Sequence, residues 1–107
     1  MDDDRKGQVA VIFASRRNRD DGEGYDTAAA AMAALAAEQP GYRGIESARG
    51  ADGFGITVSY WADEASAVAW RKHADHTAIR EQGRALWYDS YEVQVAAIER
   101  SYSWTRA

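Results

Sequence analysis

Aromatic and imidazole side chains gather in one stretch of the chain, which runs from Tyr60 to Tyr91. Both histidines of the protein, His73 and His76, and three of its four tryptophans fall there. Large aromatic rings and titratable imidazoles together suit a pocket for a flat, oxidisable ligand, because rings stack on such a ligand and an imidazole exchanges a proton near neutral pH. This stretch is therefore the first candidate for a functional site.

A helix predicted to start after Asp63 would place Trp70 and His73 on one face if it stays regular. The same row then continues with Thr77, Arg80, Arg84 and Trp87. Such a strip could hold an anionic aromatic ligand by stacking and charge, with His73 as the base that takes a proton from a phenol. The alternative is an ordinary half-buried helix whose arginines pair with neighbouring carboxylates.

Trp61 is a further candidate for the wall of such a cavity, because it ends a predicted strand next to this helix. The core or a dimer contact is the default position of so large an aromatic side chain. The candidate ligand-binding residues are thus Trp61, Trp70, Arg80, Arg84 and Trp87, and the candidate catalytic residue is His73.

The spacing of His73 and His76 would allow two imidazoles to hold one metal ion. A catalytic metal site normally needs a third protein ligand, and only Asp75 or Glu81 is at hand. We therefore expect no metal. His76 shares its helical row with Ile79, so we expect a hydrogen-bonded structural histidine there.

Composition excludes several classes of protein. The 107 residues suit one domain, and we expect a flexible segment over residues 1–7 followed by a single domain over 8–107. The net charge of -4 argues against nucleic acid, and the lack of cysteine excludes thiol catalysis and disulfides. No apolar run is long enough to span a membrane, and Asp2, Asp3 and Asp4 do not resemble a signal-peptide start. A cytoplasmic protein is the default expectation.

The first half of the chain predicts a strand, a helix and a second strand. Gln8 to Ser15 is a short β-branched and aromatic run, and Tyr25 to Glu38 is an alanine-rich stretch with helical spacing of its larger residues. Pro40 and Gly41 end that helix. Tyr42 to Arg49 follows as a strand candidate.

The second half predicts a hairpin partner, a second helix and a last strand. Gly50 to Gly53 contains an Asp-Gly pair, which favours a hairpin to the strand Phe54–Trp61. Asp63 is a plausible N-cap of the second helix. This helix is expected to bend near Ala74 and Asp75, and either it or a successor helix is expected to continue to about Tyr88. Tyr91 to Tyr102 reads as a strand with a bulge near residues 96–98.

This order predicts an α+β fold of the ferredoxin-like βαββαβ type, with a four-stranded antiparallel sheet and both helices on one face. The chain offers no further helix for the other face. Pairing of two sheets in a homodimer, as a dimeric α/β barrel, would cover it.

The chain resembles the antibiotic biosynthesis monooxygenase domain family from Val9 to Tyr102. The resemblance is carried by a Pro-Gly turn followed by a strand at residues 39–47 and by a strand-ending Trp followed by an acidic helix start at residues 59–65. Residues 69–76 and 83–88 are similar to a widespread bacterial subgroup whose members are mostly uncharacterised. The resemblance implies dimerisation through the sheets. Some members of the family oxygenate aromatic polyketides without metal or flavin, and others bind and degrade haem.

The haem-degrading branch is similar at Trp70 but departs elsewhere. Its iron-binding histidine lies nearly three turns beyond that tryptophan, where this chain has Ile79 and Arg80. The asparagine that this branch uses on the first strand would fall near Ser15. The resemblance therefore disfavours haem as a cofactor, although haem binding through His73 or His76 stays as a third possibility.

The first functional hypothesis is a cofactor-independent monooxygenase that acts on an electron-rich, polyketide-like or quinol-like aromatic small molecule. Molecular oxygen would be the co-substrate, His73 the base and the tryptophans the walls of a dry cavity. The alternative is a dimeric small-molecule-binding or stress-associated module without turnover.

Overall fold

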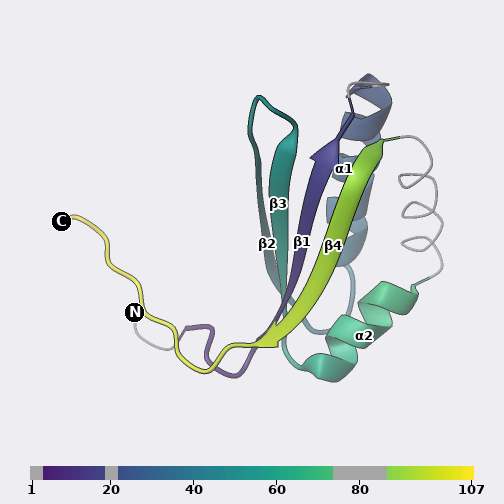
Figure 1. Ribbon diagram of the computed structural model, residues 1–107. Coiled ribbons are helices and arrows are strands. Elements are labelled where there is room, and N and C mark those ends of the chain that lie inside the picture. Colours follow the sequence, from purple (N-terminus) through teal and green to yellow (C-terminus); the bar gives the residue numbers. More distant parts are fainter. Residues whose placement is uncertain (1–3, 19–21, 74–86) are drawn as a thin grey trace.

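The computed structural model describes residues 4–18, 22–73 and 87–107. Four strands and two helices follow one another in the order strand, helix, strand, strand, helix, strand (Figure 1). Their bounds are β1 Val9–Arg17, α1 Gly22–Ala37, β2 Tyr42–Arg49, β3 Phe54–Trp61, α2 Glu64–Lys72 and β4 Tyr88–Ala97.

The strands form one antiparallel sheet in the order β2-β3-β1-β4. Strand β1 lies in the centre, where Val11 pairs with Ser59 of β3 and with Val95 of β4. Both helices lie on the same side of this sheet (Figure 1). The predicted ferredoxin-like α+β fold is confirmed.

Two local devices fix the start of α2 and its position. Asp63 caps the helix, because its Oδ1 accepts a hydrogen bond of 2.8 Å from the backbone N–H of Ser66. That bond also lowers the pKa of the Asp63 carboxyl group. Gly41, with φ +83°, brings the α1–β2 turn against the same helix start, where a Cβ atom would lie 2.1 Å from Ser66 Oγ.

The core lies at the end of the sheet where β1 begins and β3 ends. Trp61 is fully buried there, and its ring stacks on Trp70 of α2 at 5.7 Å. Its indole N–H donates to Ser59 Oγ at 2.9 Å, which satisfies the buried donor. Val9 and Ala36 complete this contact between the sheet and both helices.

Two features of the last strand differ from the sequence-based prediction, whereas the end of α2 lies close to the predicted bend near Ala74. Helix α2 ends at Lys72, because His73 adopts ψ 132° and its N–H bonds to Trp70 O. Strand β4 covers Tyr88–Ala97 rather than Tyr91–Tyr102, and so begins where a helix was expected. In the pairing of β4 with β1, the shift in strand register lies between Arg16 and Arg17 of β1, not near residues 96–98. Neither Gly nor Pro occurs near His73 to indicate the end of the helix.

Both ends of the described chain lie beyond one edge of the sheet (Figure 1). The guanidinium of Arg5, in the segment predicted to be flexible, lies 3.6 Å from the centre of the Tyr60 ring. After β4 the chain runs away from the sheet as an extended arm, on which Tyr102 and Trp104 are exposed. No helix of the described part is long and apolar enough to cross a membrane.

Candidate ligand-binding cavity

A cavity of about 230 Å³ lies between α1 and the sheet. Most of its lining is apolar, and the alanines of α1 leave the space because their side chains are short. The described residues that line it are Val11, Phe13, Tyr25, Ala28, Ala29, Met32, Ala33, Ile45, Ser47, Thr57, Ser59, Trp70, Arg71, Trp87, Tyr88 and Val93. The buried core closes one end of this space, and a group of tyrosines forms the other.

Three hydroxyl groups interrupt the apolar sheet face beneath α1. Ser47 of β2 pairs with Thr57 of β3, and Ser59 lies one pair further along the same face. Hydroxyl groups can both donate and accept hydrogen bonds, so this row can hold a polar substituent of a flat ligand. The side chains on either side of the row are apolar, and they would hold the ring itself.

Two of the predicted tryptophans line the cavity, and they arrive from different elements. Trp70 projects from α2, while Trp87 directly precedes β4 and meets the Tyr25 ring edge-on at 5.8 Å. The backbone N–H of Asn18 donates to Trp87 O at 2.9 Å and fixes the start of β4 beside the end of β1. The tertiary fold therefore brings the two indoles to one cavity, although they do not share one regular helix.

Trp61 is not among the residues that line the cavity. Its ring is fully buried behind Trp70 and Ser59 and belongs to the core. It supports the wall rather than forming it.

His73 lies at the end of α2, with its ring 6.3 Å from the Trp70 ring. It is not among the lining residues, and its buried Nδ1 has no hydrogen-bond partner among the residues that the structure describes. The row predicted from Trp70 through His73 to Arg84 cannot lie on one helical face, because α2 ends before His73. Arg80, Arg84 and His76 lie outside the described residues.

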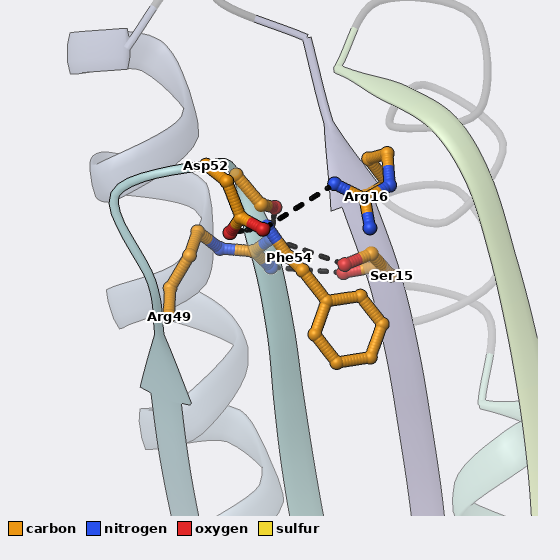
Figure 2. Close-up of polar contacts among 6 residues, drawn as sticks. Ser15, Arg16, Arg49, Asp52 and Phe54 are labelled. Carbon is orange, nitrogen blue, oxygen red and sulfur yellow. Dashed lines mark hydrogen bonds and ion pairs between the residues drawn. The ribbon is translucent and has the colours of Figure 1, made fainter.

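A polar network forms the end of the cavity near the β2–β3 hairpin. Arg49 of β2 reaches across the neighbouring strand to Ser15 of β1, as Figure 2 shows. Its Nη2 donates to Ser15 Oγ at 2.8 Å and to the Tyr25 hydroxyl at 3.2 Å. Its Nη1 donates to the carbonyl of Gly53.

Gly55 leaves the space for this arginine. In the register of the sheet it stands between Ser15 and Arg49, and a Cβ atom there would lie 2.8 Å from Arg49 Cζ. On the opposite side of the sheet, Arg16 forms an exposed ion pair of 3.7 Å with Asp52 (Figure 2). The hairpin thus places one arginine toward the cavity and the other toward solvent.

Tyr25 and Tyr88 carry the hydroxyls at this end of the cavity. The pKa of Tyr88 is raised, above all by burial and then by its hydrogen-bonded neighbour Tyr25, while Arg49 and Arg17 act in the opposite direction. The Arg17 guanidinium lies 3.9 Å from the centre of the Tyr25 ring. Tyr88 is therefore a neutral hydroxyl at neutral pH, with two guanidinium groups near it.

Most of these polar residues were missed by the sequence-based site prediction. Tyr25 counted only as one residue of a helical row, and Arg49 only as the end of a strand. One signal was present: Thr57 and Ser59 alternate with Trp61 on the strand face that the helices had to cover. Polar residues on a covered sheet face are uncommon, and they indicate a lined cavity rather than a filled core.

The sequence model of the family described as antibiotic biosynthesis monooxygenase matches residues 8–82. This chain belongs to that family. The matched range contains α1, β1, β2 and β3 entirely, and thus most of the described cavity wall. Trp87 and Tyr88 fall just beyond it.

Two relatives match most of this chain in sequence. YqjZ of Bacillus subtilis, an uncharacterised protein, is 50% identical over 91 residues, which cover 85% of this chain and 79% of YqjZ. A jasmonate monooxygenase of Pyricularia oryzae is 31% identical over 86% of this chain. The chain spans only 44% of the length of that fungal protein.

Solved structures of the same fold include SnoaB, a cofactor-independent oxygenase from Streptomyces nogalater. A mutant form of SnoaB has a TM-score of 0.77 at 18% identity, over 89% of this chain and 96% of SnoaB. A conserved protein from Methanosarcina mazei has a TM-score of 0.76 at 9% identity, over 85% of this chain and 92% of its own. At such identities the likeness concerns the fold alone.

Proposed function

We propose that this protein is a cofactor-independent monooxygenase of a small, electron-rich aromatic compound. The observation that carries the proposal is the apolar cavity beneath α1, with indole walls from Trp70 and Trp87 and a row of hydroxyls on its floor. Membership of the monooxygenase family and the fold shared with a cofactor-independent oxygenase support it.

The size of the cavity limits the ligand. At about 230 Å³ it exceeds the roughly 150 Å³ cavity that accepts benzene and is smaller than the roughly 300–1,000 Å³ of pockets for drug-sized ligands. A compound with one or two fused rings matches this volume. Among the aromatic substrates that the family suggests, the volume of the cavity therefore favours quinol-like compounds over large polycyclic ones.

The chemistry needs no reductant other than the substrate. A ring CH₂ group, or its tautomeric phenol, loses a proton to give an anion that reacts with O₂. One oxygen atom replaces the two hydrogens as a C=O group, and the other leaves as water, so that atoms and electrons balance. The protein would bind the ring, exclude water and stabilise the anion.

The experiment that tests this function is a product analysis under isotopically labelled oxygen gas. A panel of one-ring and two-ring hydroquinones and hydroxyarenes is incubated with the protein in the presence of a chelator. We expect one labelled oxygen atom in the organic product. A product without labelled oxygen would reject a monooxygenase. So would labelled product that forms no faster with the protein than in buffer alone.

His73 stays the proposed base for this reaction. We expect His73→Ala to lower the rate of oxygen uptake by about 100-fold or more, because a positioned general base typically contributes 10²–10⁴-fold. The exposed neighbour Lys72 provides the control, since Lys72→Ala changes the same helix end without removing an imidazole. An unchanged rate in His73→Ala would remove His73 from the mechanism.

A non-catalytic ligand-binding module is the second candidate function. The position of His73 favours it, because no imidazole or carboxylate occurs among the described residues that line the cavity. A binder would quench tryptophan fluorescence with the same aromatic panel and leave the oxygen concentration unchanged.

We also propose a homodimer through the sheet face opposite the helices. Ile12 and Val58 form one cross-strand pair of this face, and Ala14 and Ile56 form the next. Together with the exposed Phe54 they make an apolar strip along the two central strands. A second copy would cover this strip.

Ile56→Lys is expected to disrupt this dimer. Ile56 is 43% exposed in the single chain, and a lysine there would place an unpaired charge in the interface, which raises the dissociation constant by at least about 100-fold. Sedimentation at matched concentrations measures the effect. Val68 of α2, at 41% exposed, gives the control Val68→Lys, which should leave the dimer intact. A dimer that tolerates Ile56→Lys would place the interface elsewhere.

A further inference from the structure

Two guanidinium groups lie at the tyrosine end of the cavity. Arg49, at the end of β2, donates to the hydroxyl groups of Ser15 and Tyr25. Arg17, from the end of β1, lies over the Tyr25 ring. An apolar cavity with two guanidinium groups at one end attracts an anionic ligand, and low polarity strengthens that attraction.

The direction of the hydrogen bonds leaves one proton for a ligand. A guanidinium only donates, so the Tyr25 oxygen must accept from Arg49. The Tyr25 hydroxyl therefore keeps its own proton, and the Tyr88 hydroxyl interacts with it. Both side chains line the cavity, so a tyrosine hydroxyl at this end can donate to a ligand.

We propose that Tyr25 and Tyr88 bind the ionised oxygen of a phenolate or enolate ligand, and that Arg49 and Arg17 stabilise its negative charge. One tyrosine hydroxyl donates directly to the ligand oxygen. Arg49 acts as a positioning residue, because it orients the Tyr25 hydroxyl and does not itself line the cavity. The inference rests on the proposed ligand cavity, but not on turnover.

The other groups that face this end are consistent with an anion. Phe13 of β1 packs against Tyr88 and Tyr91 of β4, with ring centres 5.4 and 5.2 Å apart, and gives this end an apolar wall. Arg71 of α2 is a further cation on the lining. Among the described residues, the cations that act on the Tyr88 hydroxyl are Arg49 and Arg17. A ligand oxygen beside Tyr88 would experience the same two arginines.

Titration of bound 4-nitrophenol tests the inference. Its phenolate absorbs at a longer wavelength than the phenol, one ring fits the cavity, and its nitro group makes the ring a poor substrate for oxidation. We expect the wild-type protein to lower the pKa of the bound probe by about 1, as an opposite charge nearby does. Arg49→Gln should abolish most of this shift. Arg43→Gln, on the same strand but exposed, should retain it.

Several outcomes would overturn the inference. One is that the protein does not bind 4-nitrophenol, and another is that the pKa of the bound probe is unchanged or raised. A third is that Arg49→Gln lowers the pKa of the probe as much as the wild type does. Because Arg49 also bridges β1 and β2, Arg17→Gln is the second variant, and it should reduce the shift without breaking the contact to Ser15. A lowered probe pKa without oxygen uptake by any substrate would reject the oxygenase and retain the anion site.

Discussion

Replacement of Ala33 by phenylalanine should weaken the binding of a one-ring ligand by at least about 100-fold, which corresponds to about 2.7 kcal/mol. Ala33 lies on the face of α1 that lines the cavity, and a ring at this position would occupy the space of the ligand. Quenching of tryptophan fluorescence by 4-nitrophenol measures the loss, because Trp70 and Trp87 lie in the same wall.

The adjacent residue provides a matched control for this substitution. Ala34 lies on the same helix but is exposed, so Ala34→Phe adds the same side chain outside the cavity. Its affinity for the probe should equal that of the wild type. Equal quenching in Ala33→Phe and Ala34→Phe would mean that the ligand binds somewhere other than beneath α1.

Replacement of Trp61 by alanine should lower the free energy of unfolding by about 3–5 kcal/mol, the usual cost of removing a large buried aromatic. Trp61 has no exposed surface. Its ring stacks on Trp70 and makes an edge-to-face contact with Tyr42. The loss is a large part of the roughly 5–15 kcal/mol that stabilises a domain. Urea unfolding followed by circular dichroism gives the change.

Trp104 is the control for the effect of removing an indole. It is 76% exposed on the arm that follows β4, so Trp104→Ala should change the unfolding free energy of the isolated chain by no more than about 0.5 kcal/mol. A small effect of Trp61→Ala, similar to that of Trp104→Ala, would contradict the assignment of Trp61 to the core.

Local signals were sufficient to predict most of the fold. The two strands of the hairpin, Tyr42–Arg49 and Phe54–Trp61, have the predicted bounds, because β-rich runs flank a glycine turn. Asp63 caps α2 as predicted, since an N-cap depends only on residues three positions apart. A bend of α2 was predicted near Ala74, but its exact end at Lys72 could not be predicted, because neither Gly nor Pro marks it.

The site was predictable only in part, because the tertiary fold assembles it. Trp70 and Trp87 were chosen for their residue type and share the cavity, although the helical row used to connect them ends at His73. The contact between Arg49 and Tyr25 depends on the sheet register and on the space left at Gly55. Neither the sheet register nor the space at Gly55 follows from the spacing of residues in the sequence. No periodic pattern could therefore have indicated the polar end of the cavity.

The most direct test of the account is the initial rate of oxygen uptake by the wild type and by Ala33→Phe on one hydroxyarene substrate, with a buffer blank. The account predicts uptake well above the blank for the wild type and for Ala34→Phe, and uptake near the blank for Ala33→Phe. A wild type that matches the blank across the whole panel, or an Ala33→Phe variant as fast as the wild type, would contradict the claim that the cavity beneath α1 is an oxygenase active site.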